Sequence, residues 1–87
     1  MVYSKNKNMD YIPTETTTSA VFDPDSGDTL LLEETATDIL NQLETPCDLE
    51  TLLERLCQIY DVKADDIRGD VVDFLDQLIE RKVVLVQ

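Results

Sequence analysis

The spacing of apolar and polar residues changes along the chain, and each change marks a predicted element. Residues 21–32 begin with Val-Phe, continue through the turn sequence Asp-Pro-Asp-Ser-Gly and end in three leucines. Pro24 presets φ for a tight turn, and Gly27 accepts the positive φ that reverses the chain. The pattern predicts a β-hairpin with strands at residues 19–22 and 28–33. Three consecutive leucines give the second strand two apolar faces, so we expect apolar partners on both sides of it.

After the hairpin the apolar period changes from two to 3.6 residues, which predicts three helices. The first covers residues 34–44 and ends before Pro46. The second covers residues 48–60, with Asp48 as its N-cap and with Ile59 facing inward beside the leucines. The third covers residues 64–81.

The third helix has two parallel apolar rows, which together are wider than one neighbouring element needs. Ile67, Val71, Phe74 and Leu78 form the first row, and Val72, Leu75 and Ile79 form the second. The first row predicts a helix wedged against the core. The second row is predicted to line a groove beside the leucine strand.

The two ends of the chain lack helical periodicity. Residues 1–9 are polar, which predicts a disordered tail, and residues 10–87 are predicted to form a single domain. The threonine-rich residues 11–18 predict a poorly formed first strand, and the β-branched residues 83–86 predict a last strand or a tail packed on the core. The predicted fold class is α+β, with a small N-terminal antiparallel sheet followed by a three-helix bundle.

The composition narrows the function. The net charge of −12 over 87 residues disfavours nucleic acid and anionic membranes and favours a basic or neutral peptide or protein as partner. The absence of histidine excludes Cys–His and Ser–His–Asp catalysis and Cys/His zinc sites. Two cysteines are too few for a disulfide framework; Cys57 is predicted to be a buried thiol and Cys47 an uninvolved loop residue. The sequence has no signal-peptide core, so we expect a cytoplasmic protein.

Two further sites are considered in the hairpin turn. Asp23, Asp25 and Glu34 have an EF-hand-like spacing, but the glycine falls one place early, so no metal is predicted. Ser26 follows an aspartate, as in acyl carrier proteins, which leaves an acidic carrier domain modified at Ser26 as an alternative function. A winged-helix nucleic-acid binder is the other alternative.

The order of these elements resembles the PqqD-like peptide chaperones, the recognition elements of ribosomally synthesised, post-translationally modified peptides. The resemblance rests on residues 22–36, on residues 48–52 and on residues 70–78, and it covers about residues 18 to 86. The Ser-Gly-Asp-Thr turn is similar to members associated with HPr-kinase-like proteins. The resemblance implies a winged-helix-like fold without catalytic activity or cofactor. The chain departs from the family at the end of the last helix, where Lys-Val-Val replaces a glycine followed by an apolar residue.

The resemblance also implies a binding mode. A leader segment of a precursor peptide would add as a β-strand to the edge at residues 29–33, enter a groove against the last helix, and reach a modifying or processing enzyme. The residues predicted to bind the peptide are Thr29, Leu30, Leu31, Leu32, Glu33, Val72, Leu75, Asp76 and Ile79. The same open edge could instead pair with a second copy and form a homodimer.

Overall fold

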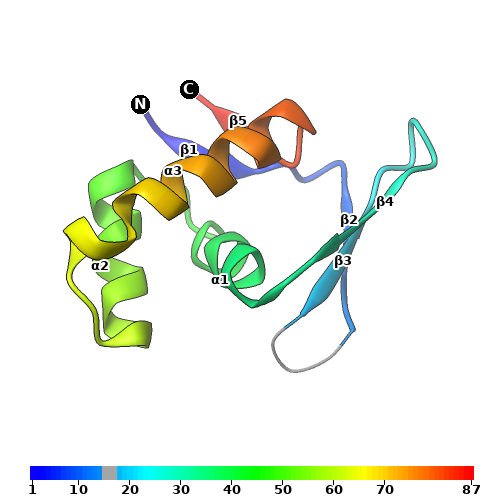
Figure 1. Ribbon diagram of the computed structural model, residues 1–87. Coiled ribbons are helices and arrows are strands. Elements are labelled where there is room, and N and C mark those ends of the chain that lie inside the picture. The colour runs from blue at the N-terminus through cyan, green and yellow to red at the C-terminus, as the bar shows by residue number, and fades with distance from the viewer. Residues whose placement is uncertain (15–17) are drawn as a thin grey trace.

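The computed structural model describes residues 1–14 and 18–87. Within them the strands form two antiparallel sheets, one of order β1-β5 and one of order β2-β3-β4. Figure 1 shows α1 between the three-stranded sheet and α2, with α3 running alongside the β1–β5 pair. The elements are β1 (Tyr3–Lys5), β2 (Asp10–Pro13), β3 (Ser19–Phe22), β4 (Thr29–Leu32), α1 (Glu34–Gln42), α2 (Leu49–Tyr60), α3 (Ala64–Glu80) and β5 (Val84–Val86). This confirms the predicted α+β fold, with its small antiparallel sheet and three helices.

The predicted β-hairpin is β3 and β4. Its turn is held by Asp23, whose side-chain Oδ1 accepts hydrogen bonds from the backbone N–H groups of Asp25 (2.9 Å) and Ser26 (3.4 Å). Gly27 has φ of +80°, the left-handed region that glycine enters without steric cost. These contacts keep Asp23 ionised at lower pH than usual, because the turn's N–H groups lower the pKa of its carboxyl. The turn projects from the domain at the right of Figure 1.

The N-terminal segment differs from its prediction. Residues 1–9 were predicted to be disordered, but β1 pairs with β5 in the register Tyr3↔Val86, Ser4↔Leu85 and Lys5↔Val84. The other side of β1 meets Cys47, since Tyr3 N–H donates to Cys47 O (2.8 Å) and Cys47 N–H donates to Tyr3 O (3.1 Å). A polar three-residue strand has no periodicity to detect, and its partners lie at the other end of the sequence.

The first strand of the hairpin sheet is β2, which the threonine-rich region 11–18 predicted only in part. It pairs with β3 in the register Tyr11↔Val21 and Ile12↔Ala20, so the sheet has three strands. Residues 15–17 of that predicted region lie outside the described residues.

The three helices pack in sequence, α1 on α2 and α2 on α3, over a core rich in leucine. Asp48 caps α2 as predicted, because its Oδ1 accepts from Thr51 N–H (2.8 Å). Arg55 ties α2 to the end of α1 by donating to Gln42 O (2.9 Å) and Thr45 O (3.1 Å). None of the helices in the described residues is long and apolar enough to cross a membrane.

Three side chains differ in burial from the sequence prediction. Cys57, predicted to be a buried thiol, is only partly buried, whereas Cys47, predicted to be an uninvolved loop residue, is buried at 8 % exposure. The bridge to Tyr3 explains this, because it draws Cys47 under the β1–β5 pair. Ile59, predicted to face inward, is 48 % exposed.

At the end of α3, a lysine takes the position where the resemblance to the PqqD-like proteins implies a glycine. Lys82 has φ of +64°, and Val83 N–H donates to Leu78 O (2.9 Å), the long backward bond that closes a helix C-terminus. Asn6 Nδ2 donates to Lys82 O (2.7 Å) and thereby fixes this turn to the N-terminal segment. The chain then leads directly into β5.

Candidate functional site

The main feature of the site is the edge of β4 that faces away from β3. Asp23 N–H donates to Asp28 O (2.9 Å), so these two residues form a hydrogen-bonded pair at the start of the ladder. Hydrogen-bonded and non-hydrogen-bonded pairs alternate along an antiparallel ladder. In the observed register, Thr29 and Leu31 therefore direct their backbone N–H and C=O groups outward, whereas Leu30 directs its own toward β3. Within the described residues no strand pairs with that outward edge.

A groove runs between this edge and α3. Its cavity volume is about 260 Å³. It is lined by Leu30, Leu31, Leu32, Glu33 and Ala36 on one side and by Phe74, Gln77, Leu78 and Arg81 of α3 on the other. Most of these side chains are apolar, so a segment seated along the edge would bury apolar surface as well as form main-chain hydrogen bonds.

The far end of β4 is anchored by α1. Thr37 is buried, and its Oγ1 donates to Leu32 O (3.3 Å) while it shares a 2.9 Å hydrogen bond with Ser19 Oγ. Leu32 is itself 6 % exposed and belongs to the core. The strand edge is therefore held rigidly in place before any ligand arrives, which lowers the entropic cost of binding.

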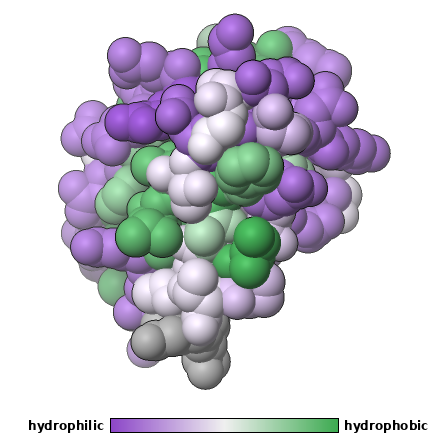
Figure 2. Space-filling model, turned by 90° about the vertical axis from the view of Figure 1, so that its right-hand side faces the viewer, coloured by the Kyte–Doolittle hydropathy of each residue, from purple (hydrophilic) through white to green (hydrophobic). Residues whose placement is uncertain are grey.

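The outer face of the three-stranded sheet is apolar at its centre. Leu31 is 75 % exposed and Ile12 is 52 % exposed, and both lie opposite Ala20 in the register, so they share one face. Figure 2 looks onto this side of the molecule and shows hydrophobic side chains surrounded by hydrophilic ones. The leucines of β4 thus face both ways, with Leu31 on the outer face and Leu30 and Leu32 on the inner face.

The structure brings the predicted strand residues together with α3, but along a different row of that helix. Leu30, Leu31, Leu32 and Glu33 line the groove, and Thr29 lies at its open edge. Leu75, at 1 % exposure, is part of the core, and Val72, Asp76 and Ile79 are not among the groove's lining residues. Contact of these residues with a peptide stays a prediction.

The lining residues of α3 that the prediction missed belong largely to the other apolar row. Phe74 and Leu78 were assigned to core packing, although Phe74 is only half-buried. Gln77 and Arg81 follow at helical spacing on the same side. The sequence signal that could have identified this row is its mixture of large apolar and polar residues, which is typical of a partly exposed helix face.

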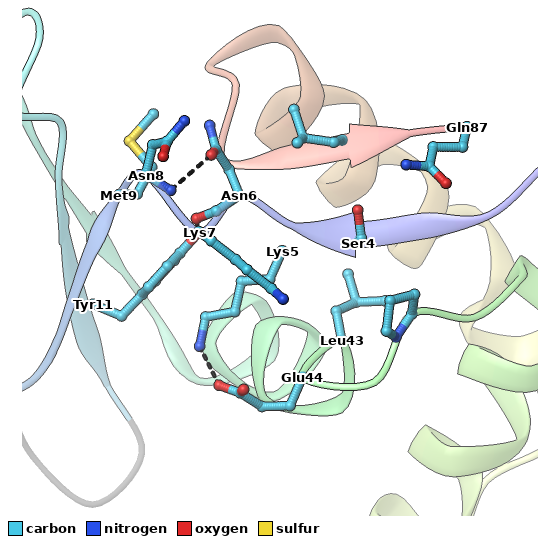
Figure 3. A pocket seen from close by; sticks show the side chains of 12 residues that line it. Ser4, Lys5, Asn6, Lys7, Asn8, Met9, Tyr11, Leu43, Glu44 and Gln87 are labelled. Atoms are coloured by element: carbon cyan, nitrogen blue, oxygen red, sulfur yellow. Dashed lines mark hydrogen bonds and ion pairs between the residues drawn. The ribbon is translucent and has the colours of Figure 1, made fainter.

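A larger hollow, of about 650 Å³, lies elsewhere (Figure 3). It is lined mainly by residues 4–9 and by the end of α1. Lys5 forms an ion pair with Glu44 across it, and this pairing lowers the pKa of the Glu44 carboxyl. The edge of β1 that faces away from β5 is already bridged to Cys47 at Tyr3.

The hairpin turn offers no chemistry of its own. Ser26 lies in the exposed turn, where its Oγ accepts from Asp28 N–H (3.2 Å), and not at the start of a helix as in acyl carrier proteins. Among the described residues, no group of three or more Cys, Asp or Glu side chains is arranged to hold a metal ion.

Fold and site together define a small α+β domain whose distinctive feature is an open strand edge beside a helix-lined groove. The chain belongs to the PqqD family: the family model described as Coenzyme PQQ synthesis protein D (PqqD) matches residues 19–84. That match covers β3, β4 and all three helices and so includes the whole groove.

The fold has a counterpart among solved structures. The chain is similar to a structure described as TbiB1 in complex with the TbiA(beta) leader peptide, with a TM-score of 0.81 and 17 % sequence identity. The similarity covers 97 % of this chain and 96 % of the other, a larger part of this chain than the family model matches. No curated protein matches the chain by sequence.

Proposed function

We propose that this protein is a non-catalytic module that binds the leader segment of a ribosomally made precursor peptide and delivers it to a modifying enzyme. The leader adds as a β-strand to the outward edge of β4 and places alternate side chains in the groove against α3. The unpaired edge at Thr29 and Leu31 is the observation on which this proposal depends.

Two comparisons support the proposal. Membership of the PqqD family places the chain among proteins whose family description refers to the synthesis of a coenzyme. The structurally similar TbiB1 was solved with a leader peptide bound. Because the two folds agree over nearly the whole of both chains, the same mode of use is the simplest one for this protein. Its assignment to the subgroup associated with HPr-kinase-like proteins stays a prediction.

The energetics fit a binding site that loads and releases its ligand. Each main-chain hydrogen bond contributes a net of about 1 kcal/mol, and the apolar groove adds burial of side chains. Ordering a flexible leader costs several kcal/mol, about 2–5. We therefore expect an affinity on the order of micromolar, which allows transfer to an enzyme.

We expect the protein to meet the precursor peptide in the cytoplasm, where ribosomally made precursors arise. The open edge of β4 also determines what the protein can bind when no peptide is present. Without a peptide, the edge of β4 can pair with that of a second copy, since exposed edges accept any strand. A homodimer formed in this way would dissociate when the peptide binds.

The test uses a phage-displayed library of random 16-residue peptides as the probe. Peptides selected on the protein are synthesised, and amide hydrogen exchange of the isotope-labelled protein is followed by NMR with and without them. We expect saturable binding and slowed exchange of the Leu31 amide, which points outward on β4. The Tyr11 amide, which points outward on β2, serves as the matched internal control and should be unchanged.

Two results would contradict the proposal. One is selected peptides that bind while the Leu31 amide exchanges as fast as before. The other is a selection that yields no saturable binder. In both cases strand addition at β4 would be rejected.

A further inference from the structure

The groove has different charges at its two ends. The end near the hairpin turn is formed by Leu30 and Arg81, which also line a smaller hollow of about 120 Å³ beside it. The other end is formed by Glu33 and Phe74, next to the start of α1. β4 and α3 therefore run in opposite directions along the groove, with a cation at one end and a carboxylate at the other.

Arg81 is the cationic residue in the lining of the groove. Its side chain makes no ion pair or hydrogen bond with any residue that the structure describes. Asp23 and Asp28 line the neighbouring small hollow. The Asp23 carboxylate already accepts the backbone N–H groups of the turn, and among the described residues neither carboxylate forms an ion pair with Arg81. The guanidinium therefore keeps its five donors for an incoming acceptor.

The opposite end has carboxylates that the fold does not use. Glu33 is the N-cap residue of α1, yet its side chain makes no capping hydrogen bond and is exposed. Beyond it, Phe74 separates the groove from a second apolar hollow of about 310 Å³, where Asp70 lies among the lining residues. A chain leaving the groove at this end passes Glu33 and then Asp70.

From this arrangement we infer the sequence class of the bound segment: an apolar run of three residues with an acidic residue at its Arg81 end and a basic residue at its Glu33 end. The inference rests on the proposed function and specifies the peptide that the site accepts. Arg81 is then a specificity-determining residue, which fixes the register and the direction in which the segment lies.

The apolar run is three residues long because β4 has leucines on both faces. A residue added directly opposite Leu31 shares its face, where Leu31 is 75 % exposed, and the two are cross-strand neighbours. The residues on either side of it point the other way, into the groove against Phe74 and Leu78. Apolar side chains are therefore favoured on both faces of the added segment, whereas a strand buried on one face only would favour them at alternate positions.

The experiment starts from one peptide selected from the random library. Two versions are made with the same apolar core, one flanked by Glu before and Lys after, and one with these flanks exchanged. Dissociation constants are measured by fluorescence anisotropy on the wild type, on Arg81→Glu and on Lys7→Glu. Lys7 lies beside the hollow of Figure 3, away from the groove, and its substitution changes the net charge equally.

We expect the wild type to prefer one order of the flanking charges, and Arg81→Glu to abolish that preference, because Glu33 remains and both ends of the groove then carry a carboxylate. Exposed ion pairs are weak, so converting attraction to repulsion at one end of the groove should change the ratio of the two dissociation constants about tenfold. Lys7→Glu should leave the ratio unchanged. The charge order that binds better reports the direction of the strand.

Equal binding of both peptides to the wild type would overturn the inference, and so would a preference that survives in Arg81→Glu. Either result, obtained while the Leu31 amide is still protected, rejects the charge rule and leaves strand addition intact. Loss of that protection with both peptides rejects the proposed function itself. The two failures are thus distinguishable in one set of samples.

Discussion

The two edges of the three-stranded sheet, on β2 and on β4, differ in their outward backbone groups and in the contacts that surround them. On β2, Thr14 N–H donates to Thr18 O (3.2 Å), so alternation along the ladder directs the backbone of Tyr11 and Pro13 outward. Pro13 has no N–H to offer, and such residues are found at protected sheet edges. On β4 the outward positions are Thr29 and Leu31, and within residues 1–14 and 18–87 no backbone group pairs with the N–H of either.

The side chains reinforce the difference. The hydroxyl of Tyr11 donates to Asn6 O (2.6 Å) and to Val83 O (3.3 Å), and Lys5 Nζ lies 4.1 Å from the centre of its ring. The edge of β2 is thus tied to the N-terminal segment and the end of α3, whereas the edge of β4 faces an apolar groove. Natural proteins usually block sheet edges to prevent aggregation. A sheet with one edge tied to the domain and the other facing an apolar groove is suited to accepting a foreign strand at the edge beside the groove.

Proline substitutions at two neighbouring residues of β4 should give the largest effect. Leu30→Pro removes an N–H that points to β3 and leaves an acceptor on that strand unpaired, which should cost about 3 kcal/mol or more. Leu31→Pro removes an outward N–H and should cost less than about 1 kcal/mol. Urea denaturation measures both, and only Leu31→Pro should remain folded and lose peptide binding.

Leu31→Thr serves as the matched control, because threonine suits a strand and keeps the N–H. Its affinity should stay within about threefold of the wild type, since a cross-strand pair is worth roughly 0.2–1 kcal/mol. Equal destabilisation by the two prolines would mean that the assumed alternation of the ladder is wrong. Normal binding by Leu31→Pro would mean that the open edge is not the binding site.

The second prediction distinguishes the two apolar rows of α3. Phe74→Ala removes a half-buried aromatic ring from the groove, and interface aromatics of this kind contribute about 2 kcal/mol. Peptide affinity should fall at least about tenfold. Ile79→Ala, on the row that the sequence favoured, should leave affinity within about twofold, because Ile79 does not line the groove. Titration of a labelled selected peptide measures both, and the reverse ranking would restore the row of Val72 and Ile79.

How much the sequence predicts depends on the range of the interactions involved. The hairpin and the three helices were predictable because Gly27, Asp48 and the apolar periods act within a few residues. The strand β1 was not, since its partners are β5 and Cys47, and a three-residue polar strand has no signal of its own. The burial of Cys47 was missed for the same reason.

The candidate site shows the same division. The leucines of β4 were identified because three apolar residues in succession conflict with the alternation of a one-sided strand. The sequence could not distinguish the two rows of α3, because both are apolar and only the packing of α3 in the folded domain decides which row faces β4. Leu75, at 1 % exposure, points into the core, and Phe74 beside it reaches the groove. The orientation of a helix about its own axis is a property of the packed domain.

A smaller effect is expected from loosening the closed edge. Tyr11→Phe removes the hydroxyl that bonds to Asn6 O and Val83 O, which should lower the free energy of unfolding by about 1 kcal/mol. Peptide affinity at β4 should not change, because the opposite edge is untouched. Urea denaturation and the peptide titration test this together. A loss of affinity without a loss of stability would show that the two edges are coupled.

The smallest expected effect is a loss of stability at alkaline pH, where the Tyr11 hydroxyl that makes this contact ionises. Burial, together with the nearby charge of Glu44, raises the pKa of Tyr11 to about 12, and burial beside Asp38 raises the pKa of Tyr60 to about 12 as well. Both folded pKa values exceed the unfolded value of about 10, so the fold favours the neutral phenols. Their contribution to stability is complete below pH 10 and is lost as the pH rises through 12. The urea midpoint should therefore fall over this window.

Two variants separate the contributions to that fall. Tyr11→Phe and Tyr60→Phe should each reduce it, because each removes one phenol whose ionisation the fold opposes. Only Tyr11→Phe should also speed amide exchange at the edge of β2, since Tyr60 bonds to Asp38 between α1 and α2, away from the sheet. If Tyr60→Phe loosened that edge equally, the tyrosine contact could not be what closes it, and the contrast between the two edges would depend on Pro13 alone.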